Sequence, residues 1–143
     1  MTIREPSATI EAIAVSLVAG DATVRHARQL MLRSENYDVR SYATCSALLA
    51  DPRSRDVPCI VLDIERNDDG PALLREMRVT GWRGRAILLD GDDADGDCAD
   101  GDYVRAAEKH GDRVMKRTVG DSSLVAAISA SVNRGWSGRN AAG

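Results

Sequence analysis

The sequence predicts an α/β protein built on a doubly wound, five-stranded parallel sheet with five helices. The chain has 143 residues, which is enough for one compact domain with one core, and its 43% apolar content is ordinary for a globular protein. Five short apolar runs alternate with five segments of helical character, and the links between them are short. Alternation of this kind is typical of parallel sheets with helices on both faces.

The element boundaries follow from periodicity and from local start and stop signals. Asp21 or Thr23 can cap the first helix, whose buried face is expected to include Val24, Ala27 and Met31. The run Cys59-Ile-Val-Leu-Asp63 is apolar without alternation, as in a strand covered on both faces. We expect strands over 11–18, 38–42, 59–63, 85–90 and 113–115, and helices over 21–33, 45–50, 70–80, 103–110 and 122–134.

The third helix opens at Gly70-Pro71, since a proline in the first turn loses no hydrogen bond, and residues Leu73, Leu74 and Met77 form its buried stripe. We assign 11–134 to one domain and 1–10 and 135–143 to flexible tails.

Composition excludes several functional classes. The net charge of −3 gives no basic surface for nucleic acid. No apolar run reaches the roughly 18 residues of a membrane helix, and the N-terminus lacks the pattern of a secretory signal, so we expect a soluble, cytoplasmic protein. Cys45, Cys59 and Cys98 form no CxxC pair and are expected as buried apolar side chains, while His26 and His110 are isolated and expected at the surface.

Three ionisable residues stand at the ends of predicted strands. Asp63 ends the third strand, Asp90 ends the fourth, and Lys116 follows the fifth. Because functional groups of doubly wound sheets gather at the carboxyl ends of the strands, two acids and a cation should meet at one edge of the sheet.

These segments resemble the receiver domains of bacterial response regulators, a flavodoxin-like fold, over roughly residues 12–134. Ile60-Val-Leu-Asp63 is similar to the phosphoacceptor strand, Val114-Met-Lys116 to the strand that ends in the family's lysine, and the segment 18–25 to the first strand and helix. The resemblance implies that Asp63 accepts a phosphoryl group, that Lys116 contacts that group, and that a magnesium ion offsets its charge.

The chain departs from the family's pattern at several of these positions. The acidic pair expected after the first strand falls on Ala19 and Gly20, so Asp21 and Asp90 become the candidate ligands that would hold magnesium together with Asp63. Asp21 is also explained as a helix cap. Asp90 stands where the family has a hydroxyl residue that triggers the switch, and Arg113 stands where it has the switch aromatic.

The resemblance implies a signalling protein rather than an enzyme. Its partners would be a histidine kinase or a histidine phosphotransfer protein, and a homodimer would form through the fourth and fifth helices and the last strand. The alternative is a pseudo-receiver adaptor that works without phosphorylation.

Two further readings are disfavoured. A flavodoxin-like enzyme or nucleotide binder would need a glycine-rich loop after the first strand, where this chain has only Gly20 followed by the anionic Asp21. In the acidic loop 90–102, no frame fits the EF-hand calcium-binding pattern.

Overall fold

The computed structural model describes residues 13–63, 70–90, 111–116 and 119–135. These residues form a five-stranded parallel sheet with the strand order β2-β1-β3-β4-β5, which confirms the predicted fold class. The strands are β1 (Ile13–Ala19), β2 (Tyr37–Tyr42), β3 (Cys59–Asp63), β4 (Arg85–Asp90) and β5 (Arg113–Lys116). The helices are α2 (Ala22–Ser34), α3 (Cys45–Ala50), α4 (Gly70–Val79) and α6 (Asp121–Gly135), with a 3₁₀ helix, η1 (Pro52–Asp56), between α3 and β3.

The predicted boundaries agree closely with the observed ones. Three elements, α3, β3 and β4, begin and end where the sequence predicted, and the other described ends differ by at most one residue. The short helix η1 was not predicted, and Gly135, which we assigned to a tail, is the last residue of α6. The predicted helix over 103–110, residues 11–12 of the first strand and the remainder of both predicted tails lie outside the described residues.

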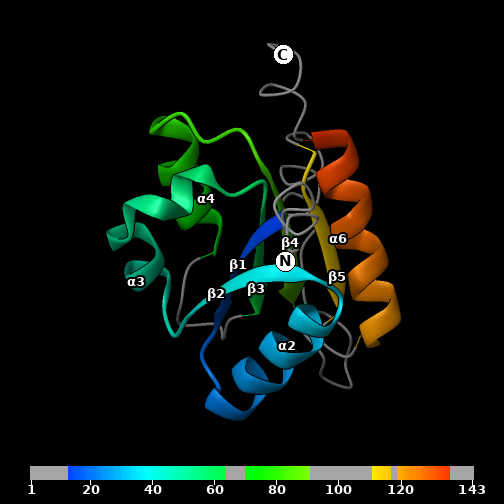
Figure 1. Ribbon diagram of the computed structural model, residues 1–143. Coiled ribbons are helices and arrows are strands. Elements are labelled where there is room, and N and C mark those ends of the chain that lie inside the picture. Colours follow the sequence, from blue (N-terminus) through cyan, green and yellow to red (C-terminus); the bar gives the residue numbers. More distant parts are fainter. Residues whose placement is uncertain (1–12, 64–69, 91–110, 117–118, 136–143) are drawn as a thin grey trace, which may run out of the picture.

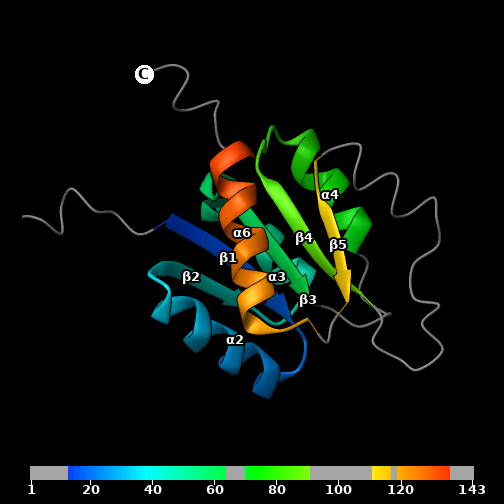
Figure 2. The ribbon, with the colours of Figure 1, turned by 90° about the vertical axis from the view of Figure 1, so that its right-hand side faces the viewer.

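Two helical layers enclose the sheet. Helices α3 and α4 cover one face, and α2 and α6 cover the other (Figures 1 and 2). Each face has its own cluster of buried side chains, with Leu48 and Met77 on the α3/α4 side and Leu32 and Ile128 on the α2/α6 side. All five residues of β3 are buried. The central strand therefore ends, at Asp63, inside the protein rather than in open solvent.

Helix α2 packs on the sheet through a face that matches the predicted one only in part. Leu32 is fully buried and Met31 is partly buried against the same core, but Ala27 is exposed, so its predicted burial is wrong. The helix begins after Asp21, which acts as the N-cap, and it ends before Asn36, whose positive φ of 73° terminates the helical path. Relative to the predicted orientation, α2 is rotated about its own axis, and this rotation brings Arg28 toward the sheet.

A polar cluster joins α4 to the amino ends of β4 and β5. The guanidinium of Arg78 lies 4.9 Å from the ring centroid of Trp82 and donates to a carboxylate oxygen of Asp112 over 2.8 Å. The same Asp112 oxygen accepts the backbone N–H of Ala86, and the indole N–H of Trp82 donates to the carbonyl of Val57 over 2.7 Å. These contacts pair polar groups that the fold buries at the end of the sheet opposite to Asp63.

Other predictions about side chains were also tested. Cys45 and Cys59 are buried, as predicted, and burial raises the pKa of Cys59 to about 12, as expected for a core residue without thiolate chemistry. His26 is exposed, as predicted, whereas Cys98 and His110 lie outside the described residues. Within those residues, no helix has the length and apolar character needed to cross a membrane.

The substitution Gly84→Ala should destabilise the fold. A Cβ at this position would lie 2.5 Å from a ring carbon of Trp82 and 2.6 Å from the carbonyl oxygen of Pro58. Because neither atom belongs to a flexible side chain, we expect a loss of about 1–3 kcal/mol in the free energy of unfolding, as for other overpacked sites. Urea unfolding measures it. Gly120→Ala is the matched control, because its Cβ would meet nothing within 4 Å, and an equal effect of both substitutions would contradict the packing argument.

Candidate functional site

The strand register brings the predicted site residues to one edge of the sheet. Asp63 at the end of β3 pairs with Ala19 at the end of β1 and with Leu89 of β4, and Asp90 pairs with Lys116 at the end of β5. The carboxyl ends of four neighbouring strands thus lie side by side, as the sequence predicted from the topology of doubly wound sheets.

Asp63 forms an ion pair with Arg28 of α2. The Nε of Arg28 donates to Oδ2 of Asp63 over 2.8 Å, and the side chains of Arg28 and Asp63 are only 12% and 3% exposed. A carboxylate this well removed from water needs a charged or hydrogen-bonding partner, because burial penalises its ionised form. Arg28 provides that partner from inside the protein chain.

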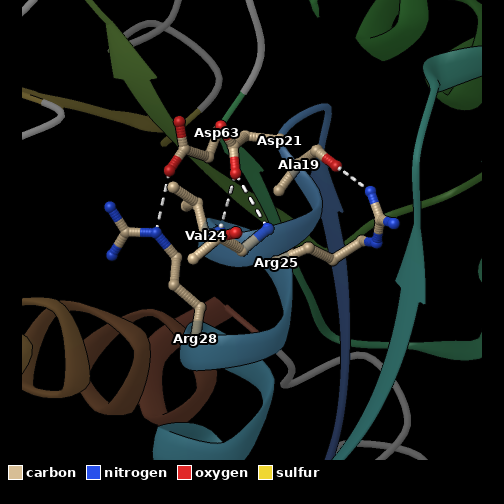
Figure 3. Close-up of polar contacts among 7 residues, drawn as sticks. Ala19, Asp21, Val24, Arg25, Arg28 and Asp63 are labelled. Atoms are coloured by element: carbon tan, nitrogen blue, oxygen red, sulfur yellow. Dashed lines mark hydrogen bonds and ion pairs between the residues drawn. The ribbon is translucent and has the colours of Figure 1, made fainter.

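A second arginine of α2 reaches the end of β1. Figure 3 shows the two side chains leaving α2 in opposite directions, with Arg28 directed to Asp63 and Arg25 directed to Ala19. The Nη1 of Arg25 donates to the backbone carbonyl oxygen of Ala19 over 2.7 Å. Both guanidinium groups therefore lie in the region where the resemblance implied an acidic pair.

Asp21 acts as the cap of α2. Its Oδ1 accepts the backbone N–H groups of Thr23 at 2.8 Å and of Val24 at 3.1 Å (Figure 3). Of the two caps that the sequence allowed, Asp21 is the one observed, and Thr23 serves as a donor to it. A carboxylate in this position also interacts favourably with the positive end of the helix dipole.

The described side chains do not fit a magnesium ion. Ala19 and Gly20 carry no oxygen ligand in their side chains, Asp21 caps α2, and Asp63 is paired with Arg28. Across the parts of the chain that the structure describes, no three His, Cys, Asp or Glu side chains gather into a possible metal site. The side chain of Asp90, the third predicted ligand, lies outside this description.

Lys116 and Arg113 occupy the two ends of β5. Both are exposed, and Lys116 lies at the same edge of the sheet as Asp63, with β4 between their strands. The phosphoryl contact by Lys116 and the substituted trigger position at Asp90 stay predictions.

Sequence reasoning missed Arg28, although a signal for it was present. Val24, Arg28 and Leu32 follow one another at intervals of four, so they share one face of a helix. An arginine between two apolar residues on that face can bury its aliphatic stem and place its charge at the edge of the core. The predicted stripe through Ala27 hid this alternative.

Comparison with solved structures finds the receiver-domain fold. A CheY-like response regulator receiver domain protein from Methanospirillum hungatei JF-1 is similar to this chain with a TM-score of 0.72 and 18% identity, covering 86% of this chain and 95% of the other. The signal receiver domain of an HD domain-containing protein from Pseudomonas fluorescens Pf-5 gives a TM-score of 0.72 at 20% identity, with 91% and 93% covered. The BeF3-activated DrrB receiver domain gives 0.69 at 18% identity, with 86% and 99% covered.

No family profile matches the chain, and no curated protein matches it either. The similarity to solved structures identifies the fold as the receiver (CheY-like) fold, with the sheet order 2-1-3-4-5.

A double-mutant cycle should reveal coupling between Arg28 and Asp63. Arg28→Met keeps most of the side-chain volume but removes the cation that pairs with the buried Asp63 carboxylate, so we expect a loss of about 3–5 kcal/mol in the free energy of unfolding. Asp63→Asn in the same chain should remove much of that loss, with a coupling energy of about 1–3 kcal/mol. Urea unfolding of the four proteins measures it.

The control is Arg33→Met, which changes an exposed arginine in the last turn of α2 and should cost less than about 0.5 kcal/mol. Strictly additive effects of Arg28→Met and Asp63→Asn would show that the ion pair contributes nothing to stability.

Proposed function

We propose that this chain is a single-domain response regulator that accepts a phosphoryl group on Asp63 and signals through contacts with other proteins. The observation that carries the proposal is a carboxylate at the end of the buried central strand of a receiver fold, at the same edge as the lysine that ends β5. The donor would be a histidine kinase or a histidine phosphotransfer protein, acting in the cytoplasm.

The proposed transfer is a single displacement at the phosphorus atom of the donor. An oxygen of Asp63 attacks phosphorus, and the new O–P bond forms as the bond from phosphorus to the donor's imidazole nitrogen breaks, with the electron pair leaving on that nitrogen. The attacking carboxylate is already an anion, so no base has to remove a proton from it. The donor imidazole leaves as a neutral ring when its other nitrogen carries a proton. Lys116 would pair with the phosphoryl oxygens as a point charge.

Signalling would follow through protein surfaces. A homodimer through β5, the predicted helix over 103–110 and α6 is part of this proposal. Of these two helices, α6 lies within the described residues.

A second candidate, a receiver-fold adaptor that works without phosphorylation, is favoured by the ion pair itself. Asp63 is 3% exposed and its Oδ2 is held by Arg28, so an incoming donor must reach a carboxylate that already has a partner. Asp90, the last residue of β4, stands in place of the hydroxyl residue that the resemblance implies at the trigger position. In this second candidate function, Asp63 serves only to pair with Arg28 in the folded protein. Partner proteins then bind to α2 and the surface beside it whether or not the chain is phosphorylated.

Phosphotransfer distinguishes the two candidates. Purified protein is incubated with acetyl phosphate, in which acetate is the leaving group, and intact mass is recorded. We expect one added phosphoryl group on wild type, none on Asp63→Asn, and one on Asp90→Asn, which controls for modification of the other carboxylate at this edge. If neither acetyl phosphate nor a panel of phosphorylated histidine kinases labels wild-type protein, the adaptor function replaces the phosphorelay function.

A further inference from the structure

We propose that Arg28 supplies from within the chain the positive charge that a divalent ion commonly provides in phosphoryl transfer, so that Asp63 works without a divalent metal. The chemistry of this inference rests on the proposed transfer to Asp63. The statement that Arg28 takes the place of a metal ion beside Asp63 does not rest on that transfer, since it concerns only which cation neutralises the Asp63 carboxylate.

The position of Arg28 is the first argument. Its Nε lies 2.8 Å from Oδ2 of Asp63, and both side chains are largely removed from solvent. A magnesium ion bound by this carboxylate would lie about 2.0–2.1 Å from a carboxylate oxygen, and therefore close to the guanidinium. Two cations at such a distance repel each other strongly where water screens them poorly. Arg28 and a metal thus compete for one carboxylate.

The donor set is the second argument. A magnesium site needs oxygen ligands, and the two residues that precede Asp21, Ala19 and Gly20, offer none from their side chains. The nearest acid in the chain, Asp21, uses Oδ1 to satisfy two backbone N–H groups of α2. Recruiting Asp21 to a metal would weaken that cap. The lack of oxygen ligands at Ala19 and Gly20 and the presence of the Arg28 guanidinium both disfavour a bound magnesium ion.

Charge balance after transfer is the third argument. Asp63 carries one negative charge before the reaction, and its phosphorylated form carries up to two on the phosphoryl oxygens. A guanidinium remains charged throughout and presents five N–H donors in a planar fork that suits phosphoryl oxygens as well as carboxylates. Arg28 can therefore neutralise both the reactant and the product, as a charge contact that is already in place.

Arg25 does not share this role, although it belongs to the same helix. Its guanidinium extends in the opposite direction and donates to the carbonyl oxygen of Ala19, so its charge is directed at β1 and not at Asp63 (Figure 3). The inference therefore concerns one arginine and makes a residue-specific prediction.

The first experiment measures the rate of labelling by acetyl phosphate in magnesium and in EDTA at equal ionic strength, using intact mass. We expect wild type to change by less than about twofold between the two conditions, and Arg28→Met to lose about tenfold or more in EDTA, since neither Arg28 nor a metal ion then neutralises the Asp63 carboxylate. Arg28→Lys keeps the charge and should recover part of the EDTA rate. Arg33→Met, on the exposed end of α2, should match wild type.

Two results of this experiment would overturn the inference: a wild-type protein that loses about tenfold or more in EDTA, or an Arg28→Met protein that is labelled in EDTA as fast as wild type. If wild type is not labelled under any condition, the proposed function fails instead, and a second measurement decides the role of Arg28.

That second measurement is the melting temperature in magnesium and in EDTA, which requires no phosphorylation. Wild type should melt at the same temperature in both, whereas Arg28→Met should melt lower in EDTA and regain part of the loss in magnesium, because a metal can then approach Asp63. A magnesium-dependent rise in wild type, or no recovery in Arg28→Met, overturns the inference. Should Arg28→Met fail to fold, the wild-type comparison decides alone.

Discussion

The site depends on one constraint, which is that the central strand of the sheet ends in a charged residue that the fold buries. Strand β3 lies between β1 and β4 and beneath helices on both faces, so the carboxylate of Asp63 cannot rely on water for its solvation. The protein meets this requirement with Arg28, a residue from the helix that follows β1. The chemistry of Asp63 consequently depends on the packing of α2, since the face that α2 turns to the sheet determines which cation reaches the carboxylate.

Most of the fold was predictable because it follows from local patterns. The buried run Cys59–Asp63 has no alternation, the loop before α2 offers a capping acid, and α4 opens with a proline in its first turn. Each signal agrees with the parallel sheet that the alternation of strands and helices predicts. A fold can be predicted from its sequence when local signals and the overall pattern agree in this way. The 3₁₀ helix η1 was missed, because Pro52 ends one helix and opens the next, and only the first effect was considered.

The candidate site was only partly predictable. Asp63 and Lys116 stand at strand ends, so topology alone brings their backbones to one edge. The partner of Asp63 could not be found in that way, because it depends on the rotation of α2 about its own axis, and a shift of one residue exchanges Ala27 for Arg28 on the inner face. The polar cluster around Trp82 was missed for a related reason, since Arg78 and Asp112 are 34 residues apart and meet only in the folded chain.

The small residues at the end of β1 have a consequence for how this surface can change during evolution. Ala19 and Gly20 add no charge beside Asp63, and Arg28 already neutralises it, so the two features are mutually consistent. An acidic residue introduced at either position would add a negative charge next to the end of β3, and loss of Arg28 alone would remove a cation that pairs with the buried Asp63 carboxylate. The effect of an acidic substitution at Ala19 or Gly20 therefore depends on whether Arg28 is present, so these positions cannot vary independently of one another.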